Sequence, residues 1–454
     1  MKSSWLDAFC SLLKYIMMML ALIMIGFPLS IVSGESTSEM QDDFEYIVNN
    51  AGHAVIIKYH GESAELVIPE TLDGYAVEAV QSLGYNYLIE SITLPNSVTV
   101  TTGEAFGLCA VLSEIRVSDD HPNLQSIDHV LFSKDGKTLI TYPSELPGEE
   151  YNVPAGTEAI DESAFCDCPF LRKIDLPDGL KSIGDNAFAL CSRLTELNIP
   201  VSVVSIGDMA FGNSGLIKLD LSQNSSLNII NDKLTYGCWQ LSEIRLPATV
   251  ESIGDEAFGF TALSSVMLPS GIQYVGLNPF RGCNQLKSVS FSGSNDRYAI
   301  QYPFLVDTEA GKAISCIECI CGKLTIPSSI VNIGDYCCFE QYEMTGLTIP
   351  ATVKRIGKSA FSNCIHLKTI NIEAESLEIL EDAFDGCDKL SSLTISGKMI
   401  HLGAGAFRKS DYLYYVRSDC EAVREYFSEL NVQVFGTDEI VLLSPSIFID
   451  SDKP

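Results

Sequence analysis

The sequence predicts a mainly β fold in the form of a solenoid, a stack of about twelve similar units of 22–24 residues. Two observations carry this prediction. A phenylalanine recurs at a nearly constant spacing along most of the chain, and each recurrence is followed by an alternating apolar and polar stretch that commonly ends in proline. A single unit of this length cannot bury its apolar face alone and must stack on its neighbours, so a fixed period of this size indicates a solenoid.

The recurrent phenylalanine serves as a marker of each unit, and we expect it to fill the core. Leu83 and Thr235 take its place in two degenerate units, which gives twelve markers in all. Adjacent markers lie 22, 23 or 24 residues apart, except across two gaps of 59 residues. The predicted structural core residues are Phe106, Phe165, Phe188, Phe211, Phe258, Phe280, Phe339, Phe361, Phe384 and Phe407.

Within a unit the pattern is I-G-x-x-A-F-x-x-C-x-x-L-x-x-[IL]-x-[IL]-P. Leu197 and Ile199 are spaced by two residues, which is the period of a short strand with one buried face. Pro200 ends that strand because proline has no N–H to donate to a neighbouring strand. Gly207 suits a tight turn. Segments this short and this rich in Gly and Pro do not sustain a helix.

Seven of the fifteen cysteines stand three residues after a marker, and we expect them to form a column of buried, free thiols. Three units lack this cysteine and are one residue shorter at this point, among them the unit marked by Phe339. Cys316-x-x-Cys319-x-Cys321, together with Cys337 and Cys338, has metal-like spacing. We interpret this cluster as structural, and one disulfide within it stays open. The column residues are Cys109, Cys168, Cys191, Cys238, Cys283, Cys364 and Cys387.

These units resemble the leucine-rich repeats of the BspA type, also called the Treponema pallidum type, over about residues 44–435. The resemblance is specific because the whole I-G-x-x-A-F-x-x-C-x-x-L-x-x-I-x-I-P string recurs in register. Proteins of that family are secreted and surface proteins of bacteria and some protists. They include adhesins that bind fibronectin and fibrinogen, so the resemblance implies adhesion.

The N-terminal residues 1–34 are predicted to form a signal peptide, because Lys2 and Lys14 precede an apolar run that ends in small residues. An uncleaved membrane anchor is the alternative, although this run is at the short limit for a membrane span. Residues 43–80 alternate polar and apolar side chains around turn residues. They are predicted to form an N-terminal β cap that includes a hairpin.

The solenoid proper is predicted at 81–410, with inserts at 117–153 and 291–327 that fill the two long gaps. Each insert is expected to be a β-hairpin. The inserts either carry binding specificity or only brace the solenoid, and the sequence favours neither. Residues 411–435 are predicted to form a strand–helix–strand cap, and the tail at 436–454 has no assigned role.

The chain is strongly acidic, with a formal net charge of -30. Such a charge argues against nucleic acid and anionic lipid as partners. Membrane contact is expected only through the N-terminal segment, if that segment is uncleaved. No known catalytic or nucleotide-binding motif occurs, and the six histidines are scattered. We therefore predict no enzyme activity, no cofactor, no metal site and a secreted or cell-surface location.

Outward positions of the repeated strands form the candidate binding face, since solenoids use such extended faces to bind proteins. We expect an extracellular protein or glycan ligand there. A structural module of the cell envelope without an external ligand is the second hypothesis, and an extracellular hydrolase is the third. The candidate residues are Glu90, Thr93, Arg116, Lys173, Asp175, Glu196, Asn198, Lys218, Asp220, Glu243, Arg245, Met267, Asn371 and Thr394.

Overall fold

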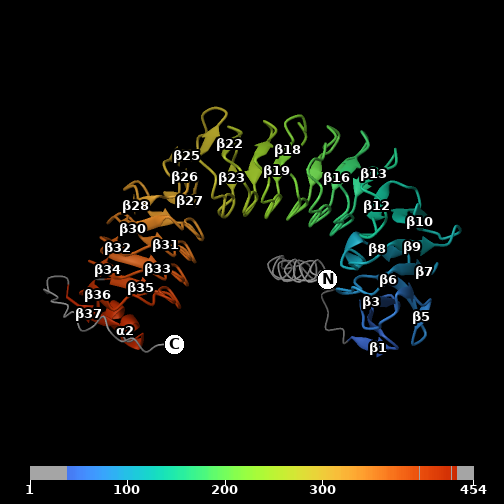
Figure 1. The fold of residues 1–454 in the computed structure, drawn as a ribbon, viewed down its shortest axis with the longest axis horizontal. Coiled ribbons are helices and arrows are strands. Elements are labelled where there is room, and N and C mark those ends of the chain that lie inside the picture. Colours follow the sequence, from blue (N-terminus) through green and yellow to red (C-terminus); the bar gives the residue numbers. More distant parts are fainter. Residues whose placement is uncertain (1–37, 398, 431, 437–454) are drawn as a thin grey trace, which may run out of the picture. The chain divides into compact units, whose positions relative to one another are not determined.

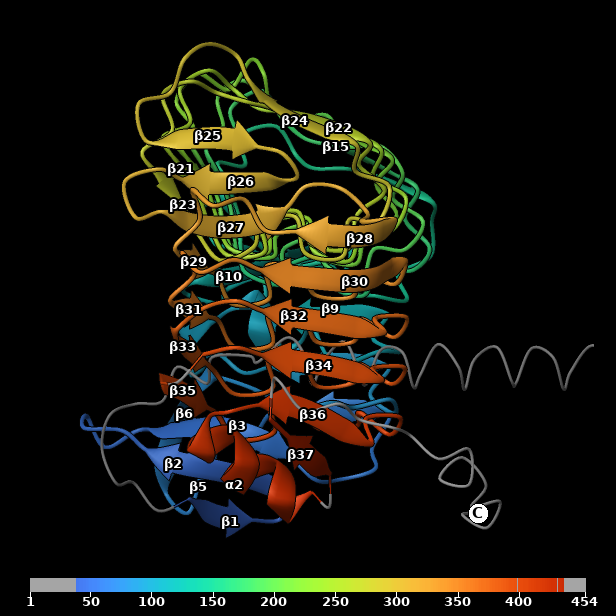
Figure 2. The same ribbon diagram turned by 90° about the vertical axis from the view of Figure 1, so that its left-hand side faces the viewer.

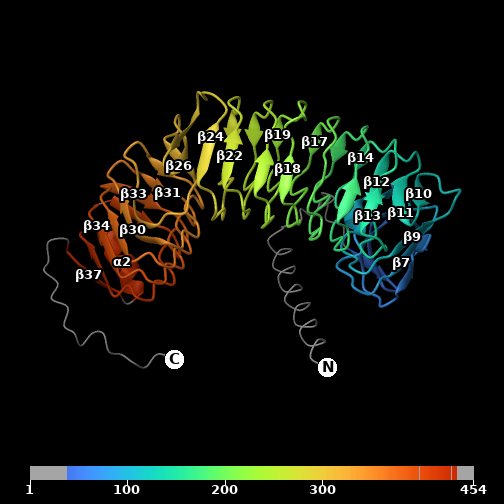
Figure 3. The same ribbon diagram turned by 45° about the horizontal axis from the view of Figure 1, so that its top comes forward.

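A computed structural model describes residues 38–397, 399–430 and 432–436. They form a β-solenoid of about 16 turns whose rungs follow one another in chain order (Figures 1 and 3), which confirms the predicted fold class. The predicted signal peptide at 1–34 and almost all of the predicted tail at 436–454 lie outside the described residues. Within the described part of the chain, no helix has the length and apolar character needed to cross a membrane.

One side of most rungs is the strand that the Leu-x-x-Ile-x-Ile stretch predicts, and we call these strands the first strand row. The strand predicted at Leu197 and Ile199 is not formed, although both side chains point inward. Parallel pairing joins them within five sheets of the described chain. The row consists of β4 (Glu65–Val67), β7 (Ser91–Leu94), β9 (Glu114–Val117), β13 (Glu150–Asn152), β15 (Lys173–Asp175), β18 (Lys218–Asp220), β20 (Glu243–Arg245), β22 (Ser265–Leu268), β24 (Ser288–Phe291), β28 (Gly322–Thr325), β30 (Met344–Ile349), β32 (Thr369–Ile372), β34 (Ser392–Ile395), β36 (Tyr415–Ser418) and β37 (Gln433–Phe435).

The other side of each rung is a second strand, in most rungs only two residues long, and these strands form the second strand row. Figure 2 shows the two rows next to each other in the C-terminal half. The second row consists of β6 (Tyr75–Val80), β8 (Val100–Thr101), β14 (Ala159–Ile160), β16 (Ser182–Ile183), β17 (Ser205–Ile206), β19 (Ile229–Ile230), β21 (Ser252–Ile253), β23 (Tyr274–Val275), β29 (Asn332–Ile333), β31 (Arg355–Ile356), β33 (Ser376–Ile379) and β35 (Met399–Leu402).

The marker phenylalanines stack in the core between the two rows. The rings of Phe361 and Phe384 lie 5.2 Å apart and those of Phe384 and Phe407 5.0 Å apart, with the planes nearly parallel. Nine of the ten predicted core phenylalanines are at most 2% exposed. Stacked rings add to the free energy gained by burial, so the column ties successive rungs together.

Phe339 is the exception, and its assignment as a core marker is wrong. Cys338 fills the marker position instead: it is fully buried, and its N–H donates to Ala360 O at 2.7 Å as Phe361 N–H donates to Ala383 O at 2.8 Å. The sequence places Cys338 five residues after the Ile of I-G, as it does Phe188, Phe211, Phe258 and Phe361. Phe339 points away from the core and is half-buried. With this register only two units, not three, are one residue shorter.

In every marker turn from Phe165 onward, the residue two positions before the marker and the residue two positions after it both have a left-handed backbone conformation, with positive φ. Leu190 has a φ of 64° and Phe260 a φ of 54°. This conformation costs about 1 kcal/mol for a residue with a Cβ. It is maintained because Asn186, Phe188 and Leu190 then donate their N–H groups to carbonyls of the next rung.

Contacts between successive rungs also explain why the I-G-D sequence recurs. Asp185 Oδ1 accepts a hydrogen bond from Asp208 N–H of the next rung at 2.8 Å. An ideal Cβ on Gly207 would lie 2.1 Å from that same oxygen. Glycine is therefore required where the carboxylate of the preceding rung passes. The arrangement repeats at Gly254, where the Cβ would lie 2.3 Å from Asp232 Oδ1.

The cysteine column lies inside the solenoid, as predicted, and the fourteen described cysteines are all free. Five of the seven column thiols donate toward the marker carbonyl of the preceding rung, as Cys191 Sγ does to Phe165 O at 3.0 Å and Cys238 Sγ to Phe211 O at 2.9 Å. Cys364 Sγ donates to Cys338 O at 3.4 Å, which again identifies Cys338 as a marker.

Two caps flank the rungs. At the N-terminal end, β2 (Phe44–Val48) and β3 (Ala54–Tyr59) form an antiparallel hairpin, extended by β1 (Glu39–Gln41), while β5 (Thr71–Leu72) pairs with β6. A short 3-10 helix, η1 (Gly103–Ala105), opens the Phe106 turn. At the C-terminal end, α2 (Glu421–Glu429) lies between β36 and β37 in sequence and buries Val423 and Phe427.

The inserts are part of the solenoid wall and contribute to its core. Each contains three antiparallel strands rather than the predicted two: β10 (Leu124–Ile127), β11 (Val130–Ser133) and β12 (Thr138–Thr141), then β25 (Tyr298–Gln301), β26 (Phe304–Asp307) and β27 (Lys312–Cys316). The last strand of each joins the second strand row in parallel. Because Phe132 and Phe304 are fully buried, bracing is at least one role of the inserts.

Candidate binding surface

The fourteen predicted face residues are all exposed or half-buried, and the apolar residues that alternate with them point inward. In chain order, Glu90 precedes β7, Thr93 lies in β7, Arg116 in β9, Lys173 and Asp175 in β15, Glu196 and Asn198 in a rung without a regular strand, Lys218 and Asp220 in β18, Glu243 and Arg245 in β20, Met267 in β22, Asn371 in β32 and Thr394 in β34.

The structure places some of these residues as cross-strand neighbours and separates others. Direct neighbours are Thr93 with Arg116, Lys218 with Glu243, Asp220 with Arg245, and Asn371 with Thr394. The remaining candidates lie on separate sheets, because the hydrogen bonding of the first strand row is interrupted several times. The face is therefore a series of short polar panels.

Ion pairs occupy the panels of the N-terminal half. Arg245 contacts Glu243 at 2.8 Å and Asp220 at 3.4 Å, and Lys218 contacts Glu243 at 3.4 Å. Hydrogen bonds from Ser222, helped by these cations, hold the pKa of Asp220 below its ordinary value. Exposed pairs of this kind add about 0–1 kcal/mol each, so their main effect is to neutralise the charge of this half of the face.

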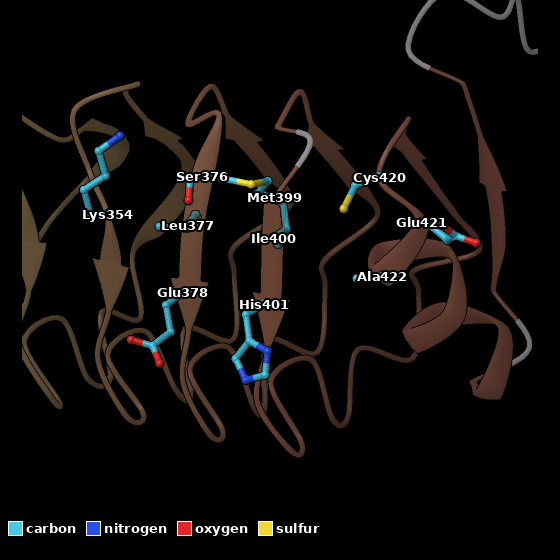
Figure 4. Close-up of a pocket in the computed structure, with 10 residues that line it drawn as sticks. All are labelled: Lys354, Ser376, Leu377, Glu378, Met399, Ile400, His401, Cys420, Glu421 and Ala422. Carbon is cyan, nitrogen blue, oxygen red and sulfur yellow. The ribbon is translucent and has the colours of Figure 1, made fainter.

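A shallow hollow of about 460 Å³ lies on the second strand row beside the start of α2 (Figure 4). Glu378 of β33 and His401 of β35 are cross-strand neighbours, and Lys354 lies at the other edge. The sequence interpretation did not identify this hollow, although its polar residues stand at outward positions of the strands. It offers charged and hydrogen-bonding groups to a ligand, without a nucleophile in contact with a base.

The described part of the chain contains no Cys–His or Ser–His pair of the kind that catalyses hydrolysis. No histidine there hydrogen-bonds a cysteine thiol or a serine hydroxyl; His366, for example, contacts Tyr342 O at 2.7 Å. Burial raises the pKa of Cys191 to about 12 and that of Cys238 to about 11. Thiols with raised pKa values are poor nucleophiles at neutral pH because little thiolate forms.

The cysteine-rich loop after β27 does not assemble a metal site. Among residues 38–397, 399–430 and 432–436, no three His, Cys, Asp or Glu side chains are grouped closely enough to hold an ion. Cys316 is buried, Cys319 is half-buried and Cys321 is exposed, so their side chains lie in different environments.

Sequence reasoning also missed an aromatic cluster at the marker turns near the second insert. Arg281 lies 4.3 Å from the ring centroid of Phe339 and 4.6 Å from that of Tyr336, and its Nη1 contacts Glu256 Oε1 at 2.5 Å. Trp239 is 60% exposed, and its ring packs against that of Phe260 with the two ring centroids 5.4 Å apart. The cluster explains what Phe339 does: it covers a nearly buried arginine.

Comparisons with known proteins agree with this architecture. A family model described as the BspA type leucine-rich repeat region matches residues 77–148, 158–287 and 314–427 in six copies. A solved structure of a leucine-rich cell surface protein from Faecalibacterium prausnitzii matches with a TM-score of 0.50 and 20% identity, over 90% of this chain and 100% of that chain. At this identity the similarity supports the fold alone.

Two further solved structures are similar at lower scores. A leucine-rich repeat protein from Bacteroides ovatus has a TM-score of 0.42 and 17% identity, over 90% of this chain and 99% of that chain. The pneumococcal vaccine antigen PcpA has a TM-score of 0.42 and 16% identity, over 89% of this chain and 99% of that chain. No curated protein sequence matches the chain.

Proposed function

Because the chain belongs to the family of BspA-type leucine-rich repeat proteins, we propose that it is an exported, non-enzymatic protein that binds an extracellular macromolecule. The proposed binding surface is the first strand row, with an extracellular protein or glycan as ligand and adhesion to host or partner cells as the result. The membership accounts for the repeat, while the surface proposal rests on the geometry of the rungs.

The observation that carries the proposal is the regular presentation of polar side chains along the first strand row. Each rung adds an outward side chain to a column, as Thr348, Asn371 and Thr394 do in adjacent strands. Solenoids bind partners through extended surfaces of this kind. The second strand row presents shorter strands, many of them only two residues long, and offers less continuous surface.

A binding screen of the purified chain without residues 1–34 against extracellular matrix proteins and partner-cell surfaces tests the proposal. Removing the inserts is unsuitable because Phe132 and Phe304 belong to the core. We therefore choose Thr93→Arg, Glu196→Arg and Met267→Arg, which change outward side chains of the first row. Arg at Ser182 and Ser252 of the second row provides the matched control.

We expect the first-row variants to lose binding while their circular dichroism and melting temperature stay unchanged. The second-row control should bind like the unmodified chain. Equal binding by all variants would remove the first strand row as the binding surface. Absence of any ligand in the screen would favour the structural role in the cell envelope instead.

A further inference from the structure

The C-terminal part of the first strand row differs in charge from the rest of the protein. Its six strands, β28, β30, β32, β34, β36 and β37, form one continuous sheet that we call the C-terminal sheet (Figure 2). None of these strands contains Asp or Glu, although the chain has 59 acidic residues and a net charge of -30. Earlier strands of the row carry acids in most rungs, such as Glu114, Asp175 and Glu243.

Three cations lie on this sheet without an acidic partner among the described residues. Lys323 belongs to β28, Lys368 directly precedes β32, and Arg417 belongs to β36. Several cations of the earlier panels are paired: Lys173 contacts Asp175 at 2.6 Å, and Lys218 and Arg245 contact Glu243. Lys287, directly before β24, has no acidic partner among the described residues. The C-terminal sheet therefore offers three such cations to a partner, whereas the panels of β15, β18 and β20 neutralise theirs internally.

The three cations recur on every second strand of the sheet, which places their strands about 10 Å apart. A register column of small hydrogen-bonding side chains runs through Thr325, Thr348, Asn371 and Thr394, two residues along the strands from the column of Lys323, Gly346 and Thr369, and it continues to Arg417 and Phe435. Hydroxyl groups both donate and accept hydrogen bonds. Lys323 and Lys368 therefore lie beside this hydrogen-bonding column, and Arg417 lies within it.

A small residue keeps this surface flat. Gly346 faces outward between Lys323 and Thr369, and a Cβ at this position would lie 3.0 Å from Lys323 Cγ and 2.9 Å from Thr369 Oγ1. The apolar side chains of β28, β30, β32 and β34 are all buried. Protein interfaces depend on large aromatic or arginine anchors that fill pockets, and these four strands offer no such anchor.

We propose that the C-terminal sheet binds a linear anionic polysaccharide, carboxylated or sulfated, that lies across the strands. The inference deepens the proposed function and rests on it, since it assigns the ligand chemistry to one half of the same row. The anionic groups pair with Lys323, Lys368 and Arg417, and the sugar hydroxyls exchange hydrogen bonds with the column of Thr and Asn side chains. An acidic polypeptide offers few hydroxyl groups for that column, which favours the polysaccharide.

The acidic remainder of the chain does not abolish this attraction. At physiological ionic strength charges separated by more than about 8 Å are largely screened. Acids stand at or next to the strand ends, among them Glu343, Glu373, Asp388 and Asp419, and Glu373 Oε1 accepts a hydrogen bond from Asn371 Nδ2 at 3.1 Å. None of them lies within a strand of the sheet, although the Glu373 carboxylate reaches the column at Asn371.

In the test the full chain is immobilised and its binding of two probes is measured. Dextran sulfate is the sulfated probe, and polygalacturonate is the carboxylated one. Neutral dextran, polyglutamate and single-stranded DNA complete the set. The variant Lys323→Glu/Lys368→Glu/Arg417→Glu reverses the three free cations. Lys173→Glu/Lys218→Glu/Arg245→Glu is the matched control, because it reverses three cations of the earlier panels. A second version of both variants has Gln in place of Glu, which removes the positive charges without reversing them. Circular dichroism verifies that each variant is folded.

We expect one or both anionic polysaccharides to bind, with an affinity that falls as salt rises, and neutral dextran not to bind. The C-terminal variant should lose binding by about 10- to 100-fold, because exposed charge contacts are lost and repulsions gained. The control variant of the earlier panels should change the affinity for the polysaccharide by less than about threefold. Equal loss in both variants, equal binding of neutral dextran, or tighter binding of polyglutamate or DNA would overturn the inference. A chain that binds matrix proteins but neither anionic polysaccharide would refute this inference alone and leave the proposed function standing.

Discussion

The marker column makes a sharp prediction about Phe384. Its side chain is fully buried and stacks on Phe361 at 5.2 Å and on Phe407 at 5.0 Å. Phe384→Ala removes the burial of one aromatic ring, two ring contacts and the packing around the cavity left behind. Substitutions of this kind cost about 3–5 kcal/mol, and the two stacked neighbours place the expected loss at the upper end.

Phe339→Ala is the matched control, because it changes the same residue type outside the core. Its half-buried ring contacts the Arg281 guanidinium at 4.3 Å, so we expect a loss of about 1 kcal/mol. Cys338→Ala removes one small buried side chain and should cost about 1–2 kcal/mol.

Urea unfolding followed by circular dichroism measures the overall loss for each variant. Hydrogen exchange of the neighbouring rungs locates it, since the stability of a repeat protein is a sum of local terms. Equal losses for Phe339→Ala and Phe384→Ala would refute the register that places Cys338 in the column. A loss below about 1 kcal/mol for Phe384→Ala would refute the role of the ring stack itself.

Three further predictions concern the turns, pH and the thiols. Gly207→Ala should lower the free energy of unfolding by at least about 2 kcal/mol, measured by thermal unfolding, because the new Cβ meets backbone and carboxylate atoms. The control Gly179→Ala, with open space around the new Cβ, should change it by less than about 0.5 kcal/mol. Burial raises the pKa of Asp161 and of Asp167 to about 6. The folded chain therefore holds more protons than the unfolded chain between about pH 4 and 6. Because of this difference, the two carboxyl groups make the free energy of unfolding fall as the pH rises through that window. The Asp161→Asn/Asp167→Asn variant should remove roughly 1–3 kcal/mol of that fall in urea unfolding, and an unchanged pH profile would contradict it. Among the described cysteines, Cys321 should react fastest with a thiol reagent in the native protein because its side chain is exposed, and Cys321→Ser should abolish that fast phase.

The rung pattern could be predicted from sequence because burial leaves a strong periodic signal. Leu197 and Ile199 alternate with polar residues, and the glycine of I-G stands where a carboxylate of the preceding rung passes. The marker at Cys338 was misassigned because Phe339, next to it, matches the residue type of the other markers. Counting from the preceding Ile would have identified the buried residue.

Other features leave little trace in single residue types. Leu190 and Phe260 adopt left-handed backbone conformations that their side chains disfavour, because hydrogen bonds to the next rung compensate. Trp239 and Phe260 come from different rungs, and their contact depends on how the turns stack. The outward residues of the first row could be predicted from the strand period, whereas their division into separate panels depends on the pairing between strands.

The two inserts divide the interior into three apolar clusters. In the first insert, Leu131 and Ile140 pack with the N-terminal cluster, while Val130 and Phe132 pack with the central one. In the second, Leu305 joins the central cluster, whereas Phe304 and Val306 join the C-terminal one. A chain pulled from its two ends would consequently rupture in three steps, with each insert acting as a mechanical joint that lets one block yield while the others stay intact.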